Sequence, residues 1–216
     1  MILAVLAMAF AGCHKEPKAP ISGTENGHEW VDLGLPSGLL WATCNVGADT
    51  PEEYGDYFAW GETTTKETYN WNTYKYANGG SYENLTKYTG SDGFEVLEAS
   101  DDAAHVNWGG AWRTPTVDEM RELRDNCIHK WTTQNGVDGH LFVAFNGNTL
   151  FLPAAGYRFE TELRGAGSYG YIQTSSFSAG TPASAWSLYF YSENYGMGYG
   201  SRNSGFTVRP VCTAQD

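Results

Sequence analysis

The chain has 216 residues, with 13 Lys and Arg against 25 Asp and Glu, which gives a formal net charge of −12 at pH 7. Binding to nucleic acids or to anionic membrane surfaces needs clustered basic side chains, so this charge argues against both kinds of partner. Hydrophobic residues make up 41% of the chain, and 8 Trp, 14 Tyr and 10 Phe supply enough apolar surface for a folded core. The 26 glycines favour a chain rich in strands and loops.

The first residues predict export and a lipid anchor. Residues 1–12 (MILAVLAMAFAG) form a short apolar run that ends in small residues, as in a signal peptide, and Cys13 follows directly. Ala11-Gly12-Cys13 resembles the lipobox of bacterial lipoproteins, where cleavage precedes a cysteine that is then acylated. Phe10 stands where leucine is usual. We expect Cys13 to carry the lipid that holds the protein at the bacterial outer membrane. The alternative is a soluble protein with an apolar N-terminal strand.

A tether and one domain are expected after the anchor. Residues 13–27 contain Pro, Gly, Ser and charged side chains without hydrophobic periodicity, which is typical of a flexible linker. Lys15-Glu16 faintly resembles the charged export signal of surface lipoproteins in Bacteroidota-type bacteria, so surface exposure is expected. Residues 28–216 show no internal repeat and no second linker, and they are predicted to form a single domain.

The first part of this domain shows weak regular patterns. Two short strands, 30–33 and 38–44, are expected around a turn at Leu35–Gly38. Residues 45–90 are irregular and rich in Tyr, Trp, Asn, Thr and Gly, so this segment needs aromatic packing of its own to be ordered. A helix is expected over residues 94–105.

The clearest local signal is the capping box that Thr116 and Glu119 can form. Met120, Leu123 and Cys127 follow at helical spacing and predict a helix with one apolar face. Asn146-Gly147 predicts a turn between two antiparallel strands. Six strands are expected in this half of the chain, over residues 140–145, 149–152, 171–175, 185–191, 196–201 and 206–211.

Cysteine and histidine spacing gives no metal site. Besides Cys13 the chain has Cys44, Cys127 and Cys212, so at most one intramolecular disulfide can form, and three buried free thiols are equally consistent with the sequence. No spacing of Cys and His is typical of zinc binding, and the five histidines are scattered. We therefore predict neither a metal ion nor a cofactor.

Five segments together point to a family. They are 31–48 (VDLGLPSGLLWATCNVGA), 54–62 (YGDYFAWGE), 101–123 (DDAAHVNWGGAWRTPTVDEMREL), 150–158 (LFLPAAGYR) and 205–211 (GFTVRPV). In this order they resemble the Fibrobacter succinogenes major paralogous domain family of surface lipoproteins, over most of residues 28–212. The helix start and the closing segment are also similar to the C-type-lectin-like and formylglycine-generating-enzyme-like group. The resemblance implies an α+β fold of the C-type-lectin-like kind, with antiparallel strands, one or two helices, long irregular loops and pairing between N- and C-terminal strands.

Structural roles can be proposed for the signature residues. We expect Trp41, Trp108 and Trp112 to anchor the core. Arg113 is expected to pair with Asp101 or Asp102, or to cap carbonyls near the helix. Arg209 is expected to do the same for the last strand.

The activities of this fold group are not expected here. Formylglycine generation needs a copper-binding cysteine pair in the C-terminal part, where only Cys212 lies. Calcium-dependent lectins use a Glu-Pro-Asn or Gln-Pro-Asp triplet with Trp-Asn-Asp, and neither combination occurs. Asp101 and Asp102 are the nearest candidates for calcium, but adjacent residues on a helix diverge by about 100°. The chain is predicted not to be an enzyme.

The most unusual segment is 186–205 (WSLYFYSENYGMGYGSRNSG), whose Tyr, Asn, Ser and Gly are the residues that antibodies use for recognition. The outward-facing candidates for ligand binding are Tyr189, Tyr191, Asn194, Tyr195, Tyr199, Arg202 and Asn203. The alternative is that these are ordinary residues of a Gly-rich sheet.

Three functions remain open. The first is a cell-surface recognition domain that binds a glycan or a protein, which a concave aromatic patch would favour. The second is a structural subunit of a surface assembly, such as a pilus tip or envelope complex, which an unpaired sheet edge or a flat apolar patch would favour. The third and least favoured is an enzyme with an unrecognised site, which a pocket of carboxylates with strongly shifted pKa values would favour.

Overall fold

The structure is a computed structural model that describes residues 22–178 and 180–213. The predicted signal peptide and Cys13 lie outside the described residues, as do residues 14–21 of the predicted tether. The tether prediction is wrong for its last part. Strand β1 (Ser22–Glu25) already pairs with β2 (His28–Asp32) through a turn in which Asn26 and Gly27 have φ of 44° and 84°. These two residue types tolerate a left-handed backbone, so they close a tight hairpin where composition alone indicates a linker.

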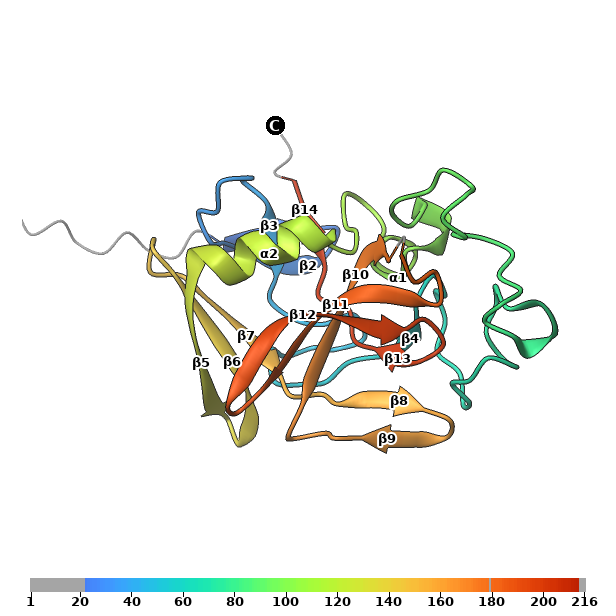
Figure 1. The fold of residues 1–216 in the computed structure, drawn as a ribbon. Helices are drawn as coiled ribbons and strands as arrows, with labels where there is room; N and C mark the ends of the chain where they lie inside the picture. Colours follow the sequence, from blue (N-terminus) through green and yellow to red (C-terminus); the bar gives the residue numbers. More distant parts are fainter. Residues whose placement is uncertain (1–21, 179, 214–216) are drawn as a thin grey trace, which may run out of the picture.

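The described chain is mostly antiparallel β-sheet with few helices, which confirms the broad α+β class (Figure 1). Besides β1 and β2, the strands are β3 (Leu40–Ala42), β4 (Phe58–Ala59), β5 (Cys127–Gln134), β6 (Val137–Ala144), β7 (Thr149–Pro153), β8 (Tyr157–Phe159), β9 (Glu162–Arg164), β10 (Gly170–Phe177), β11 (Ser184–Tyr191), β12 (Asn194–Ser201), β13 (Gly205–Phe206) and β14 (Val211–Cys212). The helices are η1 (Asn78–Gly80), η2 (Ala99–Asp101), α1 (Ala103–Trp108) and α2 (Val117–Asn126), of which η1 and η2 are short 3₁₀ turns.

Four sheets are formed by these strands, in the orders β1-β2-β3-β14, β4-β13-β8-β9, β5-β6-β7 and β10-β11-β12. In the first sheet Trp41 of β3 lies opposite Val211 of β14. The expected pairing of early and late strands is therefore confirmed. The predicted strand 206–211 is instead two short strands in different sheets, because the chain crosses from one sheet to the other between them. Strands β5, β8 and β9 were not expected.

Helix α2 begins as the sequence predicts. The Thr116 side chain accepts a hydrogen bond from the Glu119 amide, and the Glu119 carboxylate accepts one from the Thr116 amide. Met120 and Leu123 are fully buried, which confirms the apolar face. Cys127 is also buried, but it begins β5 rather than continuing the helix.

The helix expected over residues 94–105 is wrong in its bounds. Only η2 and α1 are helical there, and Asp102 separates them. The Asp102 carboxylate accepts hydrogen bonds from the amides of Ala104 and His105, at 2.9 and 3.3 Å, and thereby caps α1. The same carboxylate accepts the amide of Thr114 at 2.8 Å. Asp102 therefore starts a new helix and ties it to the chain that leads into α2.

The signature tryptophans lie in the core as expected. Trp41 and Trp112 are fully buried and Trp108 is nearly so. Aromatic residues of the irregular segment 45–90 pack together, as its composition predicts, and Phe177 of β10 joins their cluster. The buried aromatic residues of this cluster are Tyr57, Trp60, Tyr69, Tyr74, Tyr76, Tyr88 and Phe177.

Arg113 does not pair with Asp101 or Asp102, but it has the other expected role, because its guanidinium donates to the Thr114 carbonyl at 3.5 Å. Its guanidinium forms two hydrogen bonds with the Glu119 carboxylate, at 2.7 and 2.6 Å. Asp101 instead binds Lys75, Lys87 and the hydroxyl of Tyr88. Glu119 therefore serves α2 twice, since it completes the cap and fixes the arginine before the helix.

Arg209 caps carbonyls, as one of its expected roles requires. It is fully buried and donates to the carbonyls of Ala42 and Thr43 and to Oδ1 of Asn45. Burial lowers the pKa of its guanidinium to about 10, so it stays charged at neutral pH.

The three cysteines of the described chain, Cys44, Cys127 and Cys212, are free thiols. Within this part of the chain no helix is long and apolar enough to cross a membrane.

Candidate functional site

The hairpin of β11 and β12 carries most of the predicted ligand-binding residues, and its register divides them between two faces. Residues that lie opposite one another on antiparallel strands share a face. Trp186 lies opposite Tyr199 and Phe190 opposite Tyr195, so these aromatic side chains lie on one face. Tyr189 lies on the other face, opposite Gly196. Tyr191 and Asn194 form the closing pair of the hairpin and share the face of Tyr189. The candidates therefore cannot form one continuous site.

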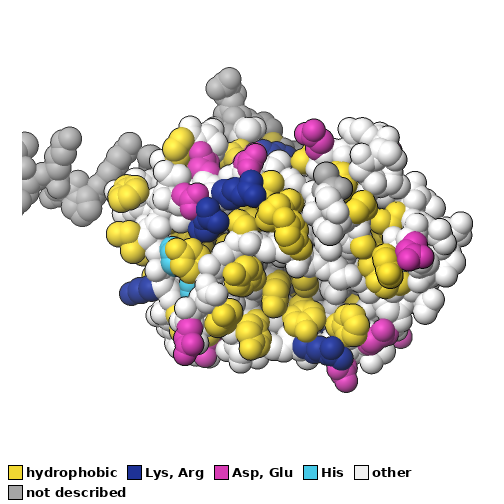
Figure 2. All heavy atoms as spheres, viewed as in Figure 1, with side chains coloured by type: hydrophobic (Ala, Val, Ile, Leu, Met, Phe, Trp, Pro, Cys, Tyr) yellow, Lys and Arg dark blue, Asp and Glu magenta, His cyan; other side chains and the backbone are white. Residues whose placement is uncertain are grey.

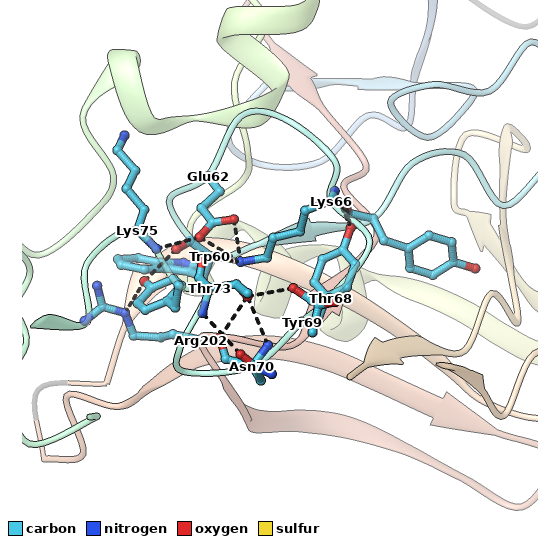
Figure 3. Close-up of polar contacts among 11 residues, drawn as sticks. Trp60, Glu62, Lys66, Thr68, Tyr69, Asn70, Thr73, Lys75 and Arg202 are labelled. Atoms are coloured by element: carbon cyan, nitrogen blue, oxygen red, sulfur yellow. Dashed lines mark hydrogen bonds and ion pairs between the residues drawn. The ribbon is translucent and has the colours of Figure 1, made fainter. Parts of the chain in front are cut away.

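The expectation that Arg202 and Asn203 face outward is wrong. The two side chains are 0% and 2% exposed. Arg202 follows β12 where the chain turns inward, and its guanidinium lies over the ring of Trp60 at 4.7 Å and near that of Tyr74 at 5.4 Å (Figure 3). It donates to the Tyr74 hydroxyl at 2.8 Å and to the Tyr88 carbonyl at 3.0 Å. Aromatic faces attract a cation, so this arginine organises the cluster and is closed to an external ligand.

The polar groups around this cluster are also structural. Figure 3 shows Glu62 next to Lys66 and Lys75 on the loop that surrounds Trp60. The Glu62 carboxylate accepts the Lys66 ammonium at 2.9 Å and the Lys75 amide at 2.8 Å. The Thr73 amide donates to Oδ1 of Asn70 at 3.1 Å, and the Thr73 hydroxyl donates to the Thr68 carbonyl at 2.6 Å. These contacts hold an irregular loop together.

Tyrosines cover the face of the sheet that carries Tyr189. A Cβ on Gly198 would lie 2.9 Å from the ring of Tyr189, so glycine lets this ring lie flat across β12. Tyr171 lies opposite Tyr189 on β10, and Tyr169 contacts Tyr191 with ring centroids 5.7 Å apart. Figure 2 shows hydrophobic side chains gathered over this sheet and down to the β8–β9 hairpin. This face therefore offers several aromatic rings for contact.

A groove of about 750 Å³ lies at the end of the hairpin where Trp186 and Tyr199 meet. Their ring centroids are 4.1 Å apart, and Tyr199 is 59% exposed. The guanidinium of Arg121 lies 4.9 Å from the centroid of Trp186 and forms an ion pair with Asp118 at 2.7 Å. The other lining residues include Phe94, Glu95, Val96, Thr116, Val117, Ser176, Phe177 and Ser178. The groove thus combines an aromatic wall with carboxylates and hydroxyls.

Sequence reasoning found only Tyr199 of this groove. Trp186 was not among the residues expected to bind a ligand, and residues 94–96 were expected to lie in a helix. Val96 instead bridges Ser176 of β10, and the Leu97 amide donates to the Ser175 carbonyl at 2.9 Å. This long-range contact makes the second wall. The alternation along β11 could have suggested that Trp186 borders the sheet, but nothing local indicates what faces it.

A second cluster lies at the other end of the hairpin. Tyr195 packs on His129 of β5 with ring centroids 3.6 Å apart, and His140 of β6 stacks on Phe190 at 5.1 Å. The Nδ1 atoms of both histidines are buried without a hydrogen-bond partner. Burial lowers the pKa of His140 to about 4, and the neighbouring His129 contributes to the shift.

These two histidines do not make a metal site. Their rings are stacked at an interplanar angle of 19°. A metal ion binds in the plane of each imidazole, and two nearly parallel planes do not meet at one ion. No group of three or more His, Cys, Asp or Glu side chains in residues 22–178 and 180–213 is arranged to hold a metal.

Comparisons of this chain with family models, with curated proteins and with solved structures find no match.

Proposed function

We propose that this protein is a lipid-anchored cell-surface lipoprotein whose domain, of the C-type-lectin-like kind, recognises a glycan without catalysing a reaction. The observation that carries the proposal is the groove walled by Trp186 and Tyr199, which is concave, aromatic and open to solvent. Largely preformed pockets with an apolar wall and a few polar groups are the usual form of a binding site.

The chemistry of the groove favours a sugar. The C–H faces of a pyranose stack on aromatic rings, and its hydroxyls donate to carboxylates such as those of Glu95 and Asp118. Arg121 already covers Trp186, so the more exposed Tyr199 is the ring on which a sugar would stack. The two carboxylates and the net charge of −12 disfavour sialylated or sulfated chains. We therefore propose a neutral glycan.

Replacement of Tyr199 should remove the stacking surface and leave the fold intact, because the ring is more than half exposed. We expect Tyr199→Ala to weaken glycan binding by at least about fivefold, since aromatic stacking contributes on the order of 1 kcal/mol or more. The measurement is binding of purified protein to an array of neutral, sialylated and sulfated glycans, followed by titration of the best binder.

Tyr169→Ala is the matched control, because Tyr169 is a similarly exposed tyrosine away from the groove. It should bind like the parent. Equal losses in the two variants, or binding restricted to anionic glycans, would contradict the assignment of the groove.

The lipid anchor has a separate test. Cys13→Ala should move the protein from the membrane fraction to the soluble fraction, because the acyl chains on that cysteine supply most of the membrane affinity. Fractionation followed by mass spectrometry of the mature N-terminus measures both the location and the acylation. An unmodified Cys13, or unchanged fractionation of the variant, would contradict the proposed anchor.

A structural subunit of a surface assembly is the second candidate. The specific observation in its favour is that β12 is the last strand of its sheet. An edge strand offers a template for another chain.

A further inference from the structure

The described chain supplies no hydrogen-bond partner to the outer backbone groups of Met197 and Tyr199 on β12, whereas the Tyr195 amide donates to Oδ1 of Asn194 at 2.8 Å. Arg202 donates its amide to the Ala183 carbonyl at 3.0 Å, which shows that even-numbered residues here turn their backbone groups toward β11. In an antiparallel pair the intervening residues turn theirs away. The outward residues are therefore Tyr195, Met197 and Tyr199. In the described chain no other element forms a backbone hydrogen bond to Met197 or Tyr199.

The outer edge of β12 lacks the features that usually keep an edge strand from pairing with another chain. Proteins block edge strands with proline, lysine, bulges or very short strands. β12 spans eight residues, NYGMGYGS, and holds no charged residue and no proline. It pairs with β11 in continuous register from Ser184–Ser201 to Tyr191–Asn194, without a bulge. The strand is long, regular and open to a further strand.

The side chains of this edge are symmetric about Met197. Tyr195-Gly196-Met197-Gly198-Tyr199 reads the same in both directions. A second copy that pairs antiparallel about a two-fold axis at Met197 would place Tyr195 of one copy opposite Tyr199 of the other, and glycine opposite glycine. Cross-strand aromatic pairs stabilise such ladders, and two-fold symmetry is the commonest form of homo-oligomer.

We propose that β12 is the dimer interface of this protein, pairing with β12 of a second copy about Met197 to form one six-stranded sheet. Tyr195 of the second copy would then lie beside Tyr199 and lengthen the aromatic wall of the groove, because opposite residues share a face. The dimer would also present two grooves to one surface ligand, which raises the effective affinity. The pairing itself does not depend on what the groove binds.

The negative charge of the two copies makes the proposed dimer dependent on salt concentration. Each copy carries a formal charge of −12, so the two copies repel one another at long range. Salt screens such repulsion over about 8 Å at physiological ionic strength, whereas backbone hydrogen bonds are little affected. We therefore expect the dimer to become more populated as salt concentration rises.

Cross-linking tests the register directly. Residues of a hydrogen-bonded antiparallel pair have Cα atoms about 5.5 Å apart, which suits a disulfide. In the full chain, Met197→Cys should form a disulfide-linked dimer under mild oxidation, because only position 197 meets itself. Ser201→Cys lies on the same edge but would face Glu193 of the second copy, so it should stay monomeric on a non-reducing gel. Cross-linking of both variants to the same extent, or of neither, would overturn the proposed register.

Sedimentation velocity tests the interface without cysteine. The parent should show a dimer whose fraction rises with protein and salt concentration. Met197→Pro removes one outward amide and should be monomeric, whereas Met197→Leu keeps the amide and should dimerise. Tyr199→Lys, at an exposed side chain, should also weaken the dimer and guards against misfolding of the proline variant. A parent that stays monomeric under all conditions, or a folded proline variant that dimerises like the parent, would overturn the proposal.

Discussion

Arg202→Ala should lower the free energy of unfolding by about 4 kcal/mol. This is the largest effect that we expect from replacing one buried side chain. The residue is fully buried, and its guanidinium donates to the carbonyls of Lys87, Tyr88 and Pro182. Its removal leaves these carbonyls without partners and opens a void between the rings of Trp60 and Tyr74. Unsatisfied buried groups cost on the order of 1 to 3 kcal/mol each.

Equilibrium unfolding in urea measures this loss, with near-UV circular dichroism reporting the aromatic cluster. Arg202→Lys should be intermediate, because an ammonium keeps the charge but lacks the planar fork that reaches several acceptors. Arg164→Ala is the control, since Arg164 is exposed and its ion pair with Glu162 is at the surface. It should change stability by less than about 0.5 kcal/mol. A similar midpoint for Arg202→Ala and the parent would show that the cluster does not depend on this cation.

Acidification should destabilise the domain through His140. The ring is nearly inaccessible, and burial lowers its pKa from 6.5 to about 4 in the folded state. Above pH 6.5 neither state binds the proton, so the native stability is complete. As the pH falls from 6.5 toward 4, the unfolded chain takes up a proton that the folded chain does not, so the free energy of the unfolded state falls and the fold loses stability. The difference in pKa corresponds to about 3 kcal/mol.

The measurement is the unfolding free energy at several pH values between neutrality and pH 4. His140→Phe should flatten this part of the profile, because phenylalanine can keep the ring contacts with Phe190 and cannot titrate. Parallel profiles for the parent and His140→Phe would contradict this role for His140.

Local signals account for what sequence reasoning predicted correctly. The capping box of Thr116 and Glu119 needs only residues three apart, and the hairpin turn at Asn146-Gly147 needs only two residues with suitable backbone freedom. The strand pattern of residues 185–191 is similarly local, and it predicted the strand that forms β11. Each of these patterns has its cause within a few residues.

The same reasoning failed where a distant segment supplied the partner. Arg202 follows a polar, glycine-rich strand and looks like a surface residue, yet rings from residues 60–88 enclose it. Arg113 was assigned to the nearest preceding acids, but the start of α2 brought Glu119 closer. A charged side chain goes to the partner that satisfies most of its donors, and the sequence does not show which segments will be near.

Sequence patterns predict the mostly β character of the chain, the start of α2 and the segment in which exposed tyrosines gather. Only the tertiary structure decided which of those residues share a surface. The register of β11 and β12 brings Trp186 to Tyr199, and the bridge between Val96 and Ser176 sets the opposite wall of the groove. Strand register and long-range bridges arise from the packing of the whole core, so no local pattern specifies them.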